Sequence, residues 1–337
     1  MCGIAGIIKF NGSSISTNEI DELTDSLAHR GPDGRGTWFN QNKNIALGHR
    51  RLSILDLSDA GHQPMISKDG FLSLVLNGEI FNFIEIKNEL KAKGHTFISQ
   101  TDTEVVLTAY KQWGLKMLDK FNGMWAMAIY NSKTRSLTLS RDRFGVKPLY
   151  YFYDENELVF ASEVKSLHKH LGQRVSINDK TIEALLRFDH SYHGTDQTYL
   201  NEVKSLKAGS NLILDNGKIE LSQWYSLAKT KVPKNFDEQA SVLKEILKDA
   251  IKIRLRSDVP VGTCLSGGID SGAISSLINT FNANDDQRFS NFTHRSFCAG
   301  FPGVDFDETN AARKLAKQLD ISLDVEIVNA PNASFLE

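Results

Sequence analysis

The cysteine at the second position is the feature of this 337-residue sequence that most directly suggests chemistry. Removal of Met1 would leave Cys2 with both its thiol and the free α-amine of the chain. An α-amine titrates near ~8 and a thiol near ~8.5, so the amine can accept the thiol proton close to neutral pH. Such a residue can attack an amide carbonyl without a histidine partner. The alternative interpretation is a small apolar side chain packed in a first strand.

A second segment suited to chemistry is the glycine- and serine-rich stretch 266–272, between an expected strand at 259–265 and an expected helix at 271–281. Backbone N–H groups at a helix start attract anions, and glycine lets the backbone approach an oxyanion closely. Ser266 and Ser271 add hydroxyl donors, and Asp270 is suited to hold a Mg²⁺ ion that bridges phosphates. The strand-loop-helix context favours phosphate binding, with a simple helix cap as the alternative for Ser271.

Short strands and helical patterns in the first two-thirds of the chain must position Cys2. Because these strands run largely without βαβ alternation, we expect an antiparallel, layered α+β domain. The expected strands are 3–10, 45–52, 71–76, 124–130, 136–141, 149–153 and 158–162, followed by a hairpin of 211–214 and 218–221. The expected helices are 18–29, 83–93 and 104–113.

The pattern changes after Leu227, where residues 229–236 form a short polar linker. Strands at 259–265, 295–301 and 322–328 then alternate with helices at 271–281 and 308–319. This βαβαβ order predicts the opening of a doubly wound parallel sheet. We therefore predict two domains, residues 1–227 and 228–337.

The composition is that of a globular enzyme, with 41% hydrophobic and 24% charged residues. The 39 Lys and Arg residues nearly balance the 41 Asp and Glu residues, which argues against nucleic-acid or membrane partners. The cysteines, Cys2, Cys264 and Cys298, are odd in number and far apart, so we expect a reducing, cytoplasmic location without disulfides. No long apolar run predicts a signal peptide or membrane span.

Five ordered motifs give the chain a resemblance to glutamine-hydrolysing asparagine synthetases. Besides the Met-Cys-Gly start, they are His-Arg-Gly-Pro-Asp at 29–33, Arg-Leu-Ser-Ile-Leu-Asp at 51–56, Asn-Gly-Glu-Ile-Phe-Asn at 77–82, Arg-Asp-Arg-Phe-Gly-Val-Lys-Pro-Leu-Tyr at 141–150 and Ser-Gly-Gly-Ile-Asp-Ser at 266–271. The resemblance covers essentially the whole chain. It implies an αββα sandwich of the N-terminal-nucleophile type, followed by the beginning of an ATP pyrophosphatase domain.

The resemblance also implies roles in the first domain. Cys2 would attack the side-chain amide of glutamine, while the Asn77 amide and the Gly78 N–H would hold the oxyanion of the tetrahedral intermediate. Arg51 would bind the carboxylate of glutamine, and Asp102, assisted by Glu79, its α-amine. The remaining implied glutamine-binding residues are Ile54 and Leu55. Without the resemblance, the residue types Asn77-Gly78 instead predict a hairpin turn. For Arg30 two roles stay open: ordering the site, or stabilising the structure.

In the second domain the resemblance implies a site for the co-substrate ATP and for the cofactor Mg²⁺. The implied ATP ligands are Leu265, Ser266, Gly267, Gly268, Asp270, Ser271 and Ala299, with Asp270 also holding the metal. Plain core strand is the alternative for Ala299, and Gly272 stands where the family usually has serine or threonine.

The implied reaction is adenylation of aspartate by ATP, after which ammonia displaces AMP to give asparagine. The partners are then glutamine, aspartate and ATP, and a homodimer is compatible with the resemblance. We expect the acceptor site to lie beyond Glu337 and the synthetase half to be incomplete. Two alternatives stay open: an amidotransferase acting on another carboxylate, such as a surface-polysaccharide sugar acid or a natural-product precursor, and a non-synthesising fragment that binds a nucleotide or a partner.

Overall fold

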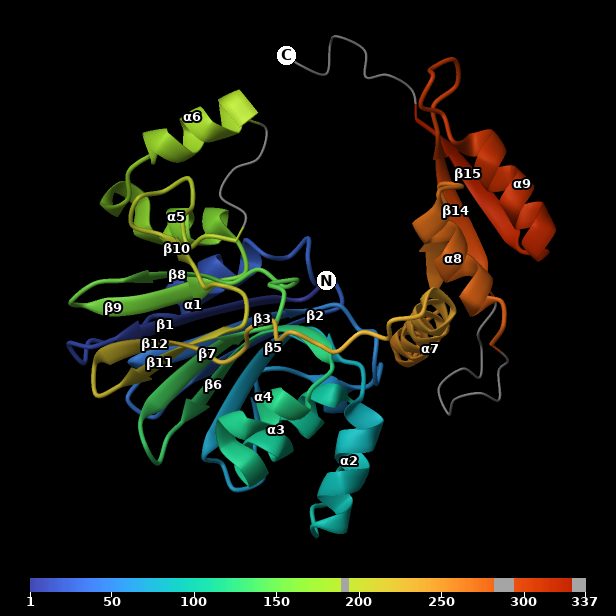
Figure 1. The fold of residues 1–337 in the computed structure, drawn as a ribbon. Coiled ribbons are helices and arrows are strands. Elements are labelled where there is room, and N and C mark those ends of the chain that lie inside the picture. The colour runs from blue at the N-terminus through green and yellow to red at the C-terminus, as the bar shows by residue number, and fades with distance from the viewer. Residues whose placement is uncertain (189–193, 282–293, 329–337) are drawn as a thin grey trace. The chain divides into compact units, whose positions relative to one another are not determined.

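The computed structural model describes residues 1–188, 194–281 and 294–328, and the chain forms two compact units, Met1–Ala228 and Lys229–Glu337 (Figure 1). The first unit contains two six-stranded sheets, each with helices on its outer face. This arrangement confirms the expected αββα sandwich.

The first sheet has the strand order β10-β8-β9-β1-β3-β2, with every neighbouring pair antiparallel. Its strands are β1 (Gly3–Lys9), β2 (Gly34–Phe39), β3 (Ile45–Arg51), β8 (Tyr150–Tyr153), β9 (Glu157–Ala161) and β10 (Lys204–Ser205). Its outer face packs against α1 (Thr17–Asp25) and α5 (Val164–Leu171). The sequence pattern did not predict β2, because Gly34 and Gly36 interrupt its apolar alternation.

The second sheet has the order β12-β11-β7-β6-β5-β4 and is also antiparallel throughout. Its strands are β4 (Met65–Ile66), β5 (Leu72–Ile80), β6 (Gly123–Asn131), β7 (Ser136–Arg141), β11 (Ser210–Asp215) and β12 (Lys218–Gln223). The helices of the first unit that remain are α2 (Phe83–Ala92), α3 (Asp102–Trp113), α4 (Met117–Lys120) and α6 (Asp179–Phe188), with short 3-10 turns at Asp59–Gly61, Gly114–Lys116 and Gly172–Arg174. Of these, α3 packs on β5 and is itself contacted by α2 and α4.

The alternation of side chains along β1 explains the layered core. Ile4 and Ile8 point between the sheets, whereas Ala5 and Ile7 point toward the layer of α1 and α5. Because both faces of this strand are covered, its residues are apolar almost without interruption. The strand is therefore rigid, and it begins one residue after Cys2.

A histidine in β3 makes the stability of this unit depend on pH. His49 is 1% exposed, and its Nε2 lies 3.1 Å from the carbonyl oxygen of Leu76. Burial lowers its pKa to about 3. Below about pH 6.5 the unfolded chain therefore binds a proton at His49, whereas the folded chain does not. The free energy of unfolding thus falls as the pH is lowered from about 6.5 to about 3.

We expect His49→Gln to remove much of this acid sensitivity. From pH 7 to pH 5 the histidine should cost the wild-type protein about 2 kcal/mol of unfolding free energy, whereas the glutamine amide still reaches Leu76 without titrating. Urea unfolding followed by tryptophan fluorescence measures this unit alone, since all four tryptophans lie before residue 229. Equal pH dependence in both proteins would contradict the prediction.

The second unit contains a parallel three-stranded sheet in the order β13-β14-β15. Its elements are α7 (Phe236–Arg254), β13 (Gly262–Cys264), α8 (Ile269–Ile278), β14 (Arg295–Gly300), α9 (Thr309–Leu319) and β15 (Ser322–Ile327). The run from β13 to β15 confirms the predicted βαβαβ order, although β13 is shorter than the expected strand. Leu265 and Cys298 pack with Ala312 and Ala316 of α9 in its core.

Candidate active site

The first unit holds a cavity of about 240 Å³ that collects every residue expected to act on glutamine. Cys2 enters it from the start of β1, and Arg51 from the end of β3. The other expected residues in its lining are Ile54, Leu55, Asn77, Gly78, Glu79 and Asp102. These side chains come from β1, β3, the loop after β3, β5 and α3, so only the folded sandwich brings them together.

The Cys2 thiol lies against the backbone of Leu52. The Leu52 N–H donates to Sγ at 3.4 Å, and the thiol faces the Leu52 carbonyl at 3.7 Å. Burial raises the pKa of this thiol above its ordinary value, and the contact with Leu52 only partly opposes that effect. A neutral thiol at pH 7 needs a base before it can attack a carbonyl.

Arg30 holds the start of the chain in place. Its Nε donates to the carbonyl oxygen of Cys2 at 2.9 Å, and its Nη1 pairs with Glu163 Oε1 at 3.0 Å. The guanidinium therefore fixes the backbone of Cys2 without contacting its sulfur. These contacts are compatible with both of the roles expected for Arg30, in ordering the site and in structure.

Asn77 and Gly78 lie inside β5, so the hairpin turn predicted from the two residues alone is wrong. They pair with Ala126 and Trp125 of β6, and a Cβ on Gly78 would lie 2.4 Å from the carbonyl oxygen of Met124. Glycine is required there by strand packing. The Asn77 side chain is fully buried, and within the described part of the chain neither amide atom has a hydrogen-bond partner. Such an orphaned amide is rare and is suited to a ligand.

Arg51 presents a cation to the cavity but is already tied to the loop that follows β3. Its Nη1 donates to Ser58 O at 2.8 Å, and its Nη2 donates to the carbonyls of Leu55 and Asp56. Carbonyl oxygens orient the guanidinium without neutralising it. Sequence reasoning did not predict these contacts, because they depend on the loop closing back on its own strand.

Asp102 presents an anion to the same cavity from the first turn of α3. Its Oδ2 accepts the Ile80 N–H at 2.9 Å, which joins the helix start to the end of β5. Burial raises the pKa of this carboxyl, and the hydrogen bonds to it oppose that shift. The buried carboxylate would therefore gain from a cationic group bound beside it.

The cavity also contains residues that sequence reasoning did not single out. The Gln63 side chain accepts the Leu76 N–H at 2.6 Å through its Oε1, and it donates to Thr103 Oγ1 at 3.2 Å through its Nε2. Met124 and Lys147 complete the wall, and Lys147 is buried. The motif at 141–150 contained Lys147, but nothing in that motif indicated which of its residues face Cys2.

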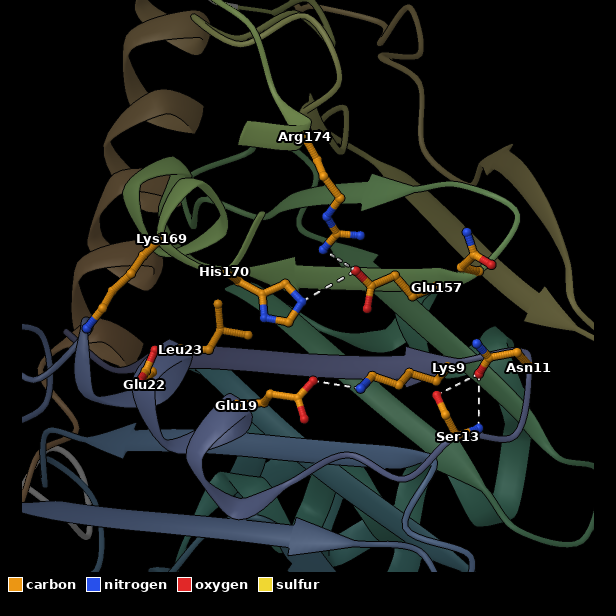
Figure 2. Close-up of a pocket in the computed structure, with 11 residues that line it drawn as sticks. Lys9, Asn11, Ser13, Glu19, Glu22, Leu23, Glu157, Lys169, His170 and Arg174 are labelled. Atoms are coloured by element: carbon orange, nitrogen blue, oxygen red, sulfur yellow. Dashed lines mark hydrogen bonds and ion pairs between the residues drawn. The ribbon is translucent and has the colours of Figure 1, made fainter. Parts of the chain in front are cut away.

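A larger cavity of about 470 Å³ lies at the other end of β1, bordered by Lys9 (Figure 2). Several of its charged groups pair with one another: Lys9 with Glu19 at 2.6 Å, and Arg174 with Glu157 at 2.6 Å. His170 also faces Glu157, at 3.4 Å (Figure 2). These pairs stabilise the junction of α1, α5 and β9, and Cys2 is not among the residues of this cavity.

The loop before α8 in the second unit has the geometry of an anion-binding turn. Gly267 has φ +81°, and a Cβ there would lie 2.6 Å from that of Ala311, so only glycine fits. Gly268 gives α8 no side-chain cap, and the hydroxyls of Ser266 and Ser271 lie 2.9 Å apart at the mouth of the loop. This arrangement leaves backbone N–H groups available for a phosphate.

The other expected nucleotide residues occupy the same region of the second unit. Leu265 is buried and donates its N–H to Phe297 O at 2.8 Å, while Asp270 is exposed in the first turn of α8. Ala299 is exposed on β14, so it is not a core residue. Among residues 1–188, 194–281 and 294–328 no three His, Cys, Asp or Glu side chains form a metal cluster.

The layered fold is that of the N-terminal-nucleophile glutamine amidotransferases. Residues 1–225 match the family model described as "Glutamine amidotransferase domain", and residues 242–334 match the one described as "Asparagine synthase". The chain therefore belongs to the glutamine amidotransferase domain family. A solved glutamine phosphoribosylpyrophosphate amidotransferase from B. subtilis, complexed with ADP and GMP, shares the fold, with a TM-score of 0.51, 17% identity and coverage of 99% of this chain and 70% of that one.

Curated relatives confirm the resemblance to glutamine-hydrolysing asparagine synthetases. The chain is 38% identical over 329 residues to "Putative asparagine synthetase [glutamine-hydrolyzing] 2" of Methanocaldococcus jannaschii, with 92% of this chain and 61% of the relative covered. It is 33% identical to "Asparagine synthetase [glutamine-hydrolyzing] 1" of Bacillus subtilis, with 95% and 49% covered. The chain thus spans about half to three-fifths of the length of these relatives. Within the described residues, no helix is long and apolar enough to cross a membrane.

Proposed function

We propose that this protein hydrolyses glutamine at Cys2 and belongs to an enzyme that uses the ammonia, with ATP, to convert aspartate into asparagine. The observation that carries the proposal is the cavity itself. It places a thiol, an amide without a hydrogen-bond partner among the described residues, a cation and an anion around one space of about 240 Å³. Glutamine carries the complementary groups: a reactive amide, a carboxylate and an ammonium.

The first half-reaction follows from these residues. Once Met1 has been removed, the α-amine of Cys2 accepts the thiol proton, and Sγ bonds to the amide carbon of glutamine. The negative oxygen that forms is stabilised by the Asn77 amide and the Gly78 N–H. The carbon–nitrogen bond then breaks, the amine returns the proton to the departing nitrogen, and ammonia leaves. Water hydrolyses the remaining thioester to give glutamate and the free thiol.

The substrate is held by groups that do not react. Arg51 is proposed to bind the carboxylate of glutamine and Asp102 its ammonium, with Glu79 assisting; Ile54 and Leu55 bound the same space. A bound ammonium would also compensate the buried charge of Asp102. Arg51 and Asp102 thus offer the cavity a cation and an anion for the two charged backbone groups of an amino acid.

The proposed second half-reaction uses the loop before α8. Ser266, Gly267, Gly268 and Ser271 would hold phosphates of ATP, and Asp270 a Mg²⁺ ion supported by them. Leu265 and Ala299 would border the nucleotide. ATP would activate the carboxylate of aspartate as its adenylate, which ammonia then converts to asparagine. The three free cysteines support a cytoplasmic location for this chemistry.

The experiment that tests the proposal measures ammonia and glutamate from glutamine, with and without ATP, Mg²⁺ and aspartate, together with AMP and asparagine. Glutamate formation supports the reaction at Cys2, and stoichiometric AMP and asparagine support aspartate as the acceptor. Glutamate without asparagine would support the reaction at Cys2 alone and would give no support to aspartate as the acceptor. Failure to form glutamate would contradict the proposal at its first step.

Arg51→Lys is expected to raise KM for glutamine by about 10- to 100-fold and to change kcat little. Lysine keeps the charge but loses the fork that binds a carboxylate bidentately, and charge-assisted hydrogen bonds contribute about 1.5–3 kcal/mol. Because the glutamine carboxylate that Arg51 is proposed to bind does not react, the substitution should weaken substrate binding and leave the turnover rate nearly unchanged. Steady-state kinetics over a range of glutamine concentrations decides this; a fall in kcat at constant KM would show that Arg51 has another role.

A further inference from the structure

Lys147 is a buried cation beside Cys2 that the proposed glutamine hydrolysis does not yet use. It lies in the segment between β7 and β8, is 6% exposed, and lines the same cavity as Cys2. Among the residues that the structure describes, its ammonium group has no hydrogen bond or ion pair, and Glu79 acts on it through charge. A lysine is rarely buried without a partner, so its position in this cavity calls for a function.

The backbone of Lys147 is held at both ends. Its N–H donates to Asp142 Oδ2 at 3.0 Å, and its carbonyl accepts from Arg141 Nε at 2.8 Å. The same Asp142 oxygen accepts the Trp125 N–H at 3.2 Å, which connects the segment to β6. Asp142 is 1% exposed, so the lysine extends into the cavity from a fixed base. Such fixed support is what a preorganised charge requires.

The electrostatics of the cavity oppose a thiolate at Cys2 unless a cation compensates. Burial is the largest cause that raises the pKa of the thiol, and the carboxylate of Asp102 raises it further; the hydrogen bond with Leu52, the amine of Met1 and Lys147 lower it. The pKa of Lys147 is itself lowered by burial, and Glu79 and Cys2 oppose that shift. The charged residues that line this space are Met1 with its amine, Arg51, Glu79, Asp102 and Lys147. Arg30, Asp33 and Asp142 also act through their charges on the Met1 amine or on Lys147.

We propose that Lys147 is an electrostatic positioning residue, whose ammonium group stabilises the negative charge on Cys2 Sγ while the thiol proton passes to the α-amine. The electron pair of the broken S–H bond stays on sulfur, next to the lysine, until the sulfur bonds to the carbon of glutamine. Arg51 is tied to three backbone carbonyls, which leaves Lys147 as the cavity cation best able to respond to this charge. The inference rests on the proposed hydrolysis of glutamine at Cys2.

The test is the pH dependence of Cys2 alkylation in the full chain. Iodoacetamide reacts with the thiolate, and mass spectrometry of the peptide that contains Cys2 separates its modification from that of the exposed Cys264. In Lys147→Met the apparent pKa of Cys2 should rise by about one to two units, as expected for loss of a nearby opposite charge. Glutamine hydrolysis at pH 7 should fall about 10- to 100-fold in kcat, with KM little changed.

Two further variants separate charge from structure. Lys147→Arg keeps the cation and should retain a Cys2 pKa within about half a unit of the wild type. Lys9→Met neutralises a lysine that is paired with Glu19 at the far end of β1, and it should leave the Cys2 profile unchanged. Lys147→Gln serves as a second neutral variant, and far-UV circular dichroism verifies folding.

Each outcome decides the inference. A folded Lys147→Met or Lys147→Gln protein with the wild-type alkylation profile would overturn it, as would failure of both neutral variants to fold, since Lys147 would then be a structural residue. A wild-type protein that does not hydrolyse glutamine would instead refute the proposed function, while the alkylation profiles would still report whether Lys147 stabilises the thiolate.

Discussion

Replacement of Cys2 by alanine or serine is expected to reduce glutamine hydrolysis to background while leaving the fold intact. Alanine removes the nucleophile. A serine hydroxyl is far less acidic than a thiol, so the α-amine should not activate it usefully. The side chain contacts Leu52 only through its sulfur, so its loss should cost little stability. The measurement is ammonia release by each purified protein, with circular dichroism as the control for folding.

The same mechanism predicts a processed chain. The α-amine that accepts the proton must belong to Cys2, so intact mass should show a protein lacking one methionine. Met1 borders the cavity, and a retained Met1 would move the amine one residue away from the sulfur. Substantial glutamine hydrolysis by Cys2→Ala, or full activity of a protein that retains Met1, would refute the assignment of the nucleophile.

Asn77→Ala is expected to lower kcat for glutamine hydrolysis by about 10²- to 10³-fold, the usual consequence of removing one oxyanion donor. Its amide has no partner within the described residues, so no other hydrogen bond there is lost. KM should change little, because the oxyanion forms only during reaction. The measurement is steady-state kinetics for both variant and wild type.

Asn211→Ala provides the matched control for this prediction. Asn211 is 2% exposed in β11 of the same sheet, its Oδ1 has no hydrogen-bond partner among the described residues, and it is outside the cavity of Cys2. Truncation there removes the same atoms from a similar environment and should leave kcat unchanged. Similar losses in the two variants would mean that Asn77 acts through the stability of the sheet and not on the intermediate.

The layered fold could be predicted from the sequence because its main signals are local. Apolar strands without intervening crossover helices indicate antiparallel sheets, and glycine and serine between a strand and a helix indicate the anion-binding turn before α8. The strand β2 and the amphipathic helix α6 were not predicted. Glycines obscure β2, and only one α6 residue, Thr181, is buried, so tertiary contacts do not reinforce its helical pattern.

The site could be predicted only in part, because its geometry depends on long-range pairing. Register places Gly3 opposite Arg50, which brings Cys2 beside the end of β3. The motifs supplied the residue types, but the residue types Asn77-Gly78 taken by themselves predicted a turn. The pairing of β5 with β6 makes it a strand with a buried amide. Lys147 was missed for the same reason: its burial depends on contacts with Arg141 and Asp142 that no periodicity reveals.

The most direct test of the account is covalent labelling of the full chain with a diazoketone analogue of glutamine, which carries the same amino acid head and alkylates a nucleophile at the amide position. Peptide mass spectrometry should find one modification, on an N-terminal Cys2, formed in parallel with loss of glutamine hydrolysis and suppressed by excess glutamine. Cys264 and Cys298 should stay unmodified at the point of complete inactivation. Inactivation with the label on any other residue, or full labelling of Cys2 with activity retained, would contradict the central claim that Cys2 is the nucleophile of a glutamine-hydrolysing site.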